Sequence, residues 1–199
     1  GTAVMNLLAG SLTFDSATGA VDRLLVTNGG TLAVKAGALT VKAGGLVLSN
    51  GSSFAVGNGS SNALYAANGG THLIASAFVV TNNGAFQLTG ATGYFGGGVT
   101  VYGSGIGGAG VLRNVSGESL VTGSVTLGSA GTIAVDAGRL RVVGVIGGGQ
   151  DLTKVGGGTL SLTNGAGLWV TNAGGTAVMN LLAGSLTFDS ATGAVDRLL

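Results

Sequence analysis

The chain has 199 residues, of which 42 are glycine, none is proline or cysteine, and 8% are charged, with a formal net charge of +1. Collagen is excluded because the glycines follow no three-residue period and proline is absent. Disorder fits poorly because 45% of the residues are hydrophobic, and a charge this close to neutral gives no electrostatic footprint for nucleic acid. The composition therefore predicts short strands of Val, Leu and Thr joined by glycine turns.

The mean hydropathy is high, at +0.59, as it is in chains that enter membranes. No stretch approaches 18 uninterrupted apolar residues, so no membrane-spanning helix is predicted. Gly1 does not open a basic segment followed by an apolar one, as a secretory signal would. We interpret the chain as an interior piece of a longer exported protein.

Along the chain, segments of about four residues with alternating apolar positions predict strands that are buried on one face. In chain order these segments are Thr31–Val34, Ala38–Val41, Leu46–Leu48, Ser53–Val56, Ser124–Leu127, Thr132–Val135, Arg139–Val142 and Thr159–Leu162. The connectors are three or four residues rich in Gly and Asn, and Asn-Gly pairs suit left-handed turns. Such pairs begin at Asn28, Asn50, Asn58, Asn68, Asn83 and Asn164.

A long internal repeat organises the chain. Residues 1–25 and 175–199 are identical, at an offset of 174 residues. We therefore divide the chain into one full tandem-repeat unit, residues 1–174, and the start of the next copy, residues 175–199. The first copy runs into Gly175 without a change of composition, which is typical of a continuous solenoid and not of separate beads.

The predicted fold class is all-β, a parallel β-helix, or β-solenoid. A strand and its turn recur every seven to eight residues or so, which is compatible with antiparallel hairpins or with a parallel β-helix. A closed sandwich or barrel would need linkers between copies, which the sequence lacks. With three faces and roughly 22 residues per coil, one unit would hold about eight coils and advance roughly 38 Å. Helices are not expected because glycine is too dense.

The segment from Gly110 to Thr163 carries a family resemblance. Its strongest part is Asp151–Leu162, DLTKVGGGTLSL, preceded by Leu112–Gly117 and Asp136–Gly138. It resembles the autotransporter-associated β-strand repeat of bacterial surface proteins. The resemblance implies a right-handed parallel β-helix at the surface of a bacterium with an outer membrane. After Thr163 the sequence departs from the family pattern.

Enzymes built on β-helices need clustered acids and bases for proton transfer. One unit has five carboxylates, Asp15, Asp22, Glu118, Asp136 and Asp151. The densest charged group is Asp136, Arg139, Arg141, Asp151 and Lys154. We interpret it as a solvated outer face with ion pairs between coils, so no catalytic residue is predicted and the protein is not expected to be an enzyme.

Cofactor and metal sites are not predicted either. His72 is the only histidine, and without a second His or a Cys it is expected to be a surface or turn residue. Gly103–Gly108 fits a G-x-G-x-x-G pattern, but no helix is expected after it. Gly147–Asp151 resembles a calcium-binding repeat only faintly, because it occurs once per unit.

The aromatic side chains have two possible roles. They are expected mostly to fill the core, with a sugar-stacking outer strip as the alternative. They are Phe54, Tyr65, Phe78, Phe86, Tyr94, Phe95, Tyr102 and Trp169. Asn-x-Ser acceptors for glycosylation begin at Asn50, Asn58 and Asn114 and carry little weight in a chain so rich in Asn and Gly.

The sequence thus predicts a structural tandem-repeat solenoid that extends an extracellular fibre, stalk or filament at a bacterial surface. An adhesin that binds a glycan or host surface is the first alternative, and a polysaccharide-degrading enzyme is the second. The expected partners are further copies of the same repeat, end to end, with lateral association into fibres.

Overall fold

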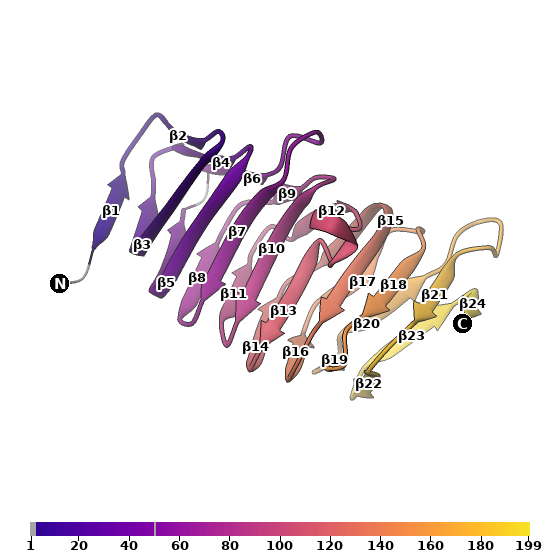
Figure 1. Ribbon diagram of the computed structural model, residues 1–199. Helices are drawn as coiled ribbons and strands as arrows, with labels where there is room; N and C mark the ends of the chain where they lie inside the picture. The colour runs from indigo at the N-terminus through magenta and orange to yellow at the C-terminus, as the bar shows by residue number, and fades with distance from the viewer. Residues whose placement is uncertain (1–2, 50) are drawn as a thin grey trace.

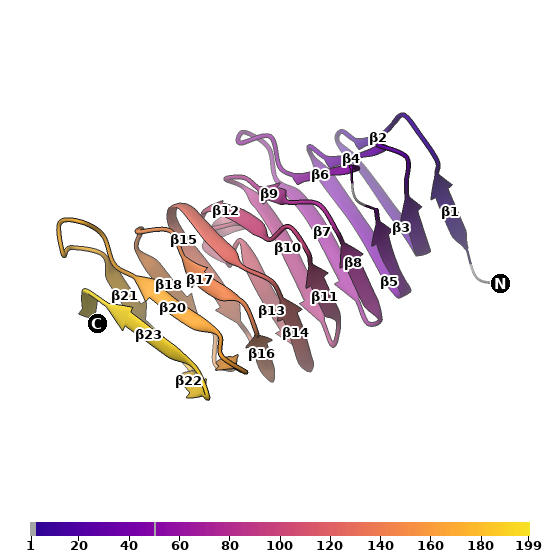
Figure 2. The same cartoon turned by 180° about the vertical axis from the view of Figure 1, so that it is seen from behind.

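The computed structural model describes residues 3–49 and 51–199, and this part of the chain winds as a right-handed parallel β-helix of about nine coils. Each strand pairs in parallel with the strands one coil before and one coil after it. The two ends of the chain lie at opposite ends of the solenoid (Figures 1 and 2). The predicted fold class and handedness are confirmed.

Each coil has three strand segments, and these stack into three flat faces. Three long strands, β3, β5 and β15, pass around a corner and contribute to two faces each. Face 1 contains β1 (Val4–Leu7), the ends of β3 (Ala17–Val26) and β5 (Gly37–Leu48), β8 (Thr71–Ile74), β11 (Thr92–Phe95), β14 (Glu118–Thr122), β16 (Arg139–Val142), β19 (Thr159–Thr163) and β22 (Ser185–Asp189).

Faces 2 and 3 are built in the same way. Face 2 contains β2 (Ser11–Phe14), β4 (Thr31–Val34), β6 (Ser53–Val56), β9 (Phe78–Val80), β12 (Val99–Gly103), the start of β15 (Val125–Val135), β17 (Val145–Gly147), β20 (Gly167–Val170) and β23 (Thr192–Val195). Face 3 contains the starts of β3 and β5, β7 (Ala63–Asn68), β10 (Gly84–Thr89), β13 (Leu112–Ser116), the end of β15, β18 (Leu152–Val155), β21 (Val178–Leu181) and β24 (Arg197–Leu198).

The core is the interior of the coil, filled by the inward residue of every second strand position. Thr31–Val34 shows the pattern, because Leu32 and Val34 are fully buried while Thr31 and Ala33 are partly exposed. The core contains a cluster of five buried rings, whose neighbouring centroids lie 4.9–6.4 Å apart. These rings belong to Phe54, Tyr65, Phe78, Phe86 and Phe95.

The corners depend on left-handed backbone, as the Asn-Gly pairs predict. Asn28 and Gly29 have φ of 53° and 73°, and Asn164 and Gly165 have φ of 56° and 78°. A residue with a β-branched side chain would be strained at either position of such a turn. The pair that begins at Asn50 includes a residue outside the described part of the chain.

Coil length varies more than the strand rhythm indicates. Val4 lies opposite Arg23, a coil of 19 residues, whereas Thr92 lies opposite Leu120, a coil of 28. The longer coil contains the short 3₁₀ turn η1 (Ile106–Gly108), the one helical element in the described residues. Extra residues are therefore accommodated at the corners without breaking the parallel ladder.

Candidate functional site

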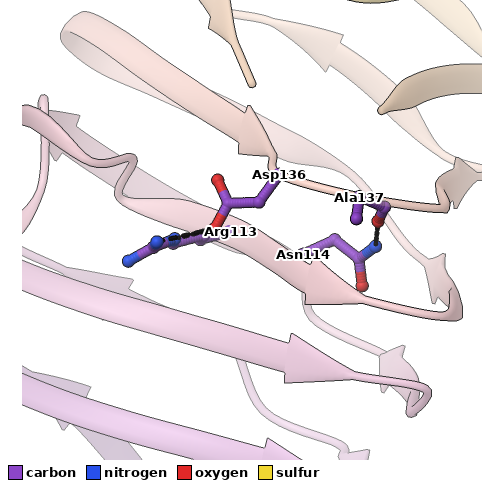
Figure 3. A network of polar contacts seen from close by, with 4 residues as sticks. All are labelled: Arg113, Asn114, Asp136 and Ala137. Atoms are coloured by element: carbon purple, nitrogen blue, oxygen red, sulfur yellow. Dashed lines mark hydrogen bonds and ion pairs between the residues drawn. The ribbon is translucent and has the colours of Figure 1, made fainter. Parts of the chain in front are cut away.

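The charged residues grouped in the sequence do not converge on one site. Asp136 follows β15 and accepts a hydrogen bond from Nε of Arg113 at 2.7 Å, and Nη2 of the same guanidinium lies 2.6 Å away. The two residues lie on adjacent coils, as Figure 3 shows, and both side chains are about a third exposed or less. The pair is a cross-coil ion pair of the kind predicted, but its cation is Arg113 and not Arg139 or Arg141.

Beside this ion pair, Asn114 points inward and is fully buried. Its amide nitrogen donates to the carbonyls of Gly117 and Ala137, at 3.1 and 3.0 Å. Its amide oxygen accepts a hydrogen bond from the hydroxyl of Ser119 at 2.7 Å, and that hydroxyl accepts from the backbone of Ala91. The side chain therefore joins three successive coils at one corner, and it cannot be a glycosylation acceptor while the chain is folded.

Lys154 is the largest departure from the predicted outer face. It lies inside the solenoid with no exposed surface, and its ammonium donates to the carbonyls of Gly156, Gly158 and Ala183 at 2.5, 2.7 and 2.9 Å. A solvated Lys154 is therefore a wrong prediction. The reason is that inward alternation from Leu152 places residue 154 in the core, where open carbonyls of two coils satisfy its charge.

Electrostatics at Lys154 follow from this position. Burial lowers the pKa of the ammonium, and the carboxylate of Asp136 opposes that shift. Gly184, in the next coil, has φ of 71° and lies against the same ammonium, so a side chain there would meet both the strain of that backbone and the Lys154 nitrogen. Lysine and glycine together form what we call the lysine clasp: Lys154, Gly156, Gly158, Ala183 and Gly184.

The remaining members of the predicted charged group lie apart. Asp151 accepts a hydrogen bond from the backbone N–H of Val178 at 2.8 Å. Arg139 is exposed on β16, opposite Glu118 of the coil before. Within the described residues, no pocket is found and no group of three or more acidic or histidine side chains is placed to hold a metal ion.

His72 is buried, which contradicts the predicted surface or turn position. It lies on β8 with no exposed surface, and its Nδ1 is 2.7 Å from the hydroxyl of Tyr65. Its Nε2 is 3.0 Å from the carbonyl of Gly69. A neutral ring that donates from Nε2 and accepts at Nδ1 satisfies both partners. Burial lowers the pKa of His72, opposed by the Gly69 hydrogen bond, and burial also raises the pKa of Tyr65 well above its usual value.

The eight aromatic residues considered above take both of the expected roles. Five fill the core, and three point outward: Tyr94, Tyr102 and Trp169, which are 42%, 37% and 44% exposed. Trp169 lies over Gly167 on face 2, where a side chain at the glycine would collide with the indole. On face 1, Tyr94 stands beside Leu73 of the preceding coil, which is also exposed. The outward rings are therefore spread over two faces and form no single strip.

The other sequence motifs are corners of the coil. Gly103–Gly108 ends in the three-residue turn η1, and Gly147–Asp151 connects β17 to β18. The acceptor at Asn58 is exposed, and its side chain receives the N–H groups of Ser60 and Ser61. The acceptor at Asn50 lies outside the described residues.

The two copies are joined by a continuous ladder, as the sequence predicts, and by side-chain contacts that sequence reasoning missed. Strands β21, β22 and β23 belong to the second copy and pair with β18, β19 and β20 of the first. The carboxylate of Asp196 accepts the N–H groups of Asn172 and Ala177, at 2.9 and 3.1 Å. The equivalent Asp22 accepts the N–H of Ala3, and this bond is the main cause of its lowered pKa. The signal was available in the duplicated Asp, since a carboxylate at a corner is a common acceptor for backbone N–H groups.

No protein-family model, curated protein or solved structure matches the chain. The resemblance of residues 110–163 to the autotransporter-associated repeat therefore stays a prediction. Among the described residues, no helix has the length and apolar character needed to cross a bilayer.

Proposed function

We propose that the chain is a load-bearing stretch of a tandem-repeat filament or stalk on the outside of a bacterium. The structure shows a β-solenoid, a fold that is typical of structural repeat proteins. The observation that carries the proposal is the junction of the copies. The parallel ladder continues from β18–β20 into β21–β23 without a linker.

The physical argument is that length is the only quantity that such a chain gains by adding copies. Each coil's backbone groups pair with the coils on both sides, so tension along the axis is distributed over three ladders per coil. The side-chain bonds of Lys154, Asp151 and Asp196 hold the same junction. Cell-surface location rests on the sequence resemblance and on the absence of cysteine, which suits an exported chain that needs no disulfide step.

Imaging of chains with two, four and six copies tests the proposal. We expect unbranched rods whose length increases by roughly 37 Å per copy, from about 4.8 Å per coil. The same chains should form no measurable hinge between copies in electron micrographs. Flexible strings of globules, or lengths that do not scale with copy number, would remove the basis for a filament.

A second candidate, an adhesin, is favoured by the outward rings of Trp169 and Tyr94. Aromatic faces on a flat sheet suit stacking against sugar rings, while no buried polar pocket is required. Binding of the chain and of its Trp169→Ala variant to a glycan array distinguishes the two functions. Specific binding that disappears in the variant supports an adhesin, and equal, weak signals from both chains support a purely structural role.

A further inference from the structure

The two copies of the duplicated sequence do not occupy the same faces of the solenoid. Strand β1 lies on face 1, and its copy β21 lies on face 3. Strand β2 lies on face 2, and its copy β22 lies on face 1. The copy has therefore moved back by one face, and the same shift holds for the copies of the two segments of β3, which are β23 and β24.

Counting segments gives the size of the unit. With β3, β5 and β15 counted twice, β21 is the 23rd strand segment after β1 in the described residues, and each coil uses three. We infer that the 174-residue unit spans seven and two-thirds coils, so that each copy is turned by one third of a turn relative to the copy before it. Three copies then restore the starting orientation, over roughly 110 Å at about 4.8 Å per coil.

The fractional turn is fixed by contacts specific to the junction. The lysine clasp ties Lys154 to the carbonyl of Ala183, and Asp151 holds the N–H of Val178. Both contacts reach from face 3 of the first copy into the opening residues of the second. A unit of eight whole coils would place β22 over β20, and these side chains would have no such partners.

The strand pairing and the aspartate contact of the duplicated sequence are the same in both places, although β3 is continuous and its copy is divided into β23 and β24. Val4 pairs with Arg23 in the first copy, and Val178 pairs with Arg197 in the second. The N–H of the alanine before each valine donates to the equivalent aspartate. Identical sequences therefore build identical corners on different faces.

The consequence concerns what a filament presents to its surroundings, and it rests on the proposed function. A side chain that is exposed once per copy, such as Trp169, recurs on all three faces in turn along an array. Neighbouring filaments, or a surface that binds the array, therefore meet the same group from every side of the fibre. A filament of whole-coil units would present it on one side only.

Cysteine pairs in the present chain test the register, because the chain has no cysteine of its own. Trp169 and Ala194 are direct partners on β20 and β23, and both point outward. Adjacent parallel strands lie about 4.8 Å apart, within the range that a disulfide spans. We expect Trp169→Cys with Ala194→Cys to close under mild oxidation, and Trp169→Cys with Thr187→Cys to stay open.

A reference pair within the first copy makes every outcome informative. Thr31→Cys with Ser53→Cys replaces two hydroxyls that lie 2.9 Å apart on β4 and β6. If this pair closes while the Trp169–Ala194 pair does not, or if the Trp169–Thr187 pair closes instead, the fractional turn is refuted. These results do not depend on whether long arrays form rods, so the register and the filament can fail separately.

Discussion

The lysine clasp gives the sharpest test of how the solenoid is held together where one copy meets the next. Replacing Lys154 by Met keeps an unbranched side chain, one atom shorter, and removes the ammonium. Three charge-assisted hydrogen bonds are lost. The buried carbonyl of Gly158 retains the N–H of Ser185 at 3.3 Å, and the carbonyls of Gly156 and Ala183 are near enough to the surface to accept from water, so the cost is that of the lost bonds to the charge.

The magnitude follows from the three bonds to the ammonium. A hydrogen bond to a charged group contributes about 1.5–3 kcal/mol, and relief of the cation's own desolvation offsets part of the sum, which leaves about 3 kcal/mol. With a denaturant slope of about 4 kcal/mol/M in guanidinium chloride, the midpoint should fall by roughly 0.7 M. Trp169, the only tryptophan, lies two strands after Lys154 and reports unfolding of these coils by its fluorescence.

The matched control is Lys42→Met, which removes an exposed lysine whose nitrogen lies 3.5 Å from Asp22. An exposed pair contributes little, so the midpoint should move by less than about 0.2 M. If both variants shift the midpoint equally, or if Lys154→Met unfolds with the parent chain, the buried ammonium does not stabilise the junction and the reasoning is wrong.

Three further predictions concern single positions. Gly184→Ala should lower the melting temperature more than Gly10→Ala does in thermal denaturation. The two glycines are the same residue of successive copies, with φ of 71° and 82°, but only Gly184 faces the lysine clasp. Equal effects would argue against a packed junction. Asn114→Ala should cost about 2–3 kcal/mol in chemical denaturation, because the three hydrogen bonds of the buried amide are lost at about 1 kcal/mol each. A change below about 0.5 kcal/mol would contradict the corner network. The pKa of His72 is lowered on folding, so the unfolded chain binds the proton more tightly; the stabilisation is complete above about pH 6.5 and is lost as the pH falls below it. Denaturation midpoints between pH 7 and 5 should therefore decline in the parent and decline less in His72→Gln, whose amide retains partners for Tyr65, and parallel curves would exclude this role.

The buried face of a strand was predictable where apolar residues occupy only one of its two sets of alternate positions. In Thr31–Val34 and Arg139–Val142, only one set of alternate positions suits the core, and the structure buries that set. In Leu152–Val155 the leucine and the valine favour opposite faces, so the sequence leaves the register undecided. Residue type then favoured an exposed Lys154, and the structure has the reverse.

The same ambiguity explains the wrong prediction for His72. It shares its strand with Leu73 and Ile74, so apolar residues occupy both faces. The imidazole was expected outward because a buried polar ring is costly without partners. Its partners are Tyr65, on the preceding strand β7, and the carbonyl of Gly69, and strand alternation identifies neither of them.

The fractional coil count shows a limit of a different kind. A mean rhythm of seven to eight residues predicts about eight coils for 174 residues, and the observed seven and two-thirds agrees with that mean. The unit falls a third of a coil short of eight because residues inserted at corners, such as the loop around η1, lengthen some coils. The lengths of these insertions do not follow from strand alternation. Because a third of a coil moves every copied strand to another face, a small error in corner length reverses the conclusion about what the fibre presents. Register at the junction, and not the strand period, therefore decides the symmetry of the array.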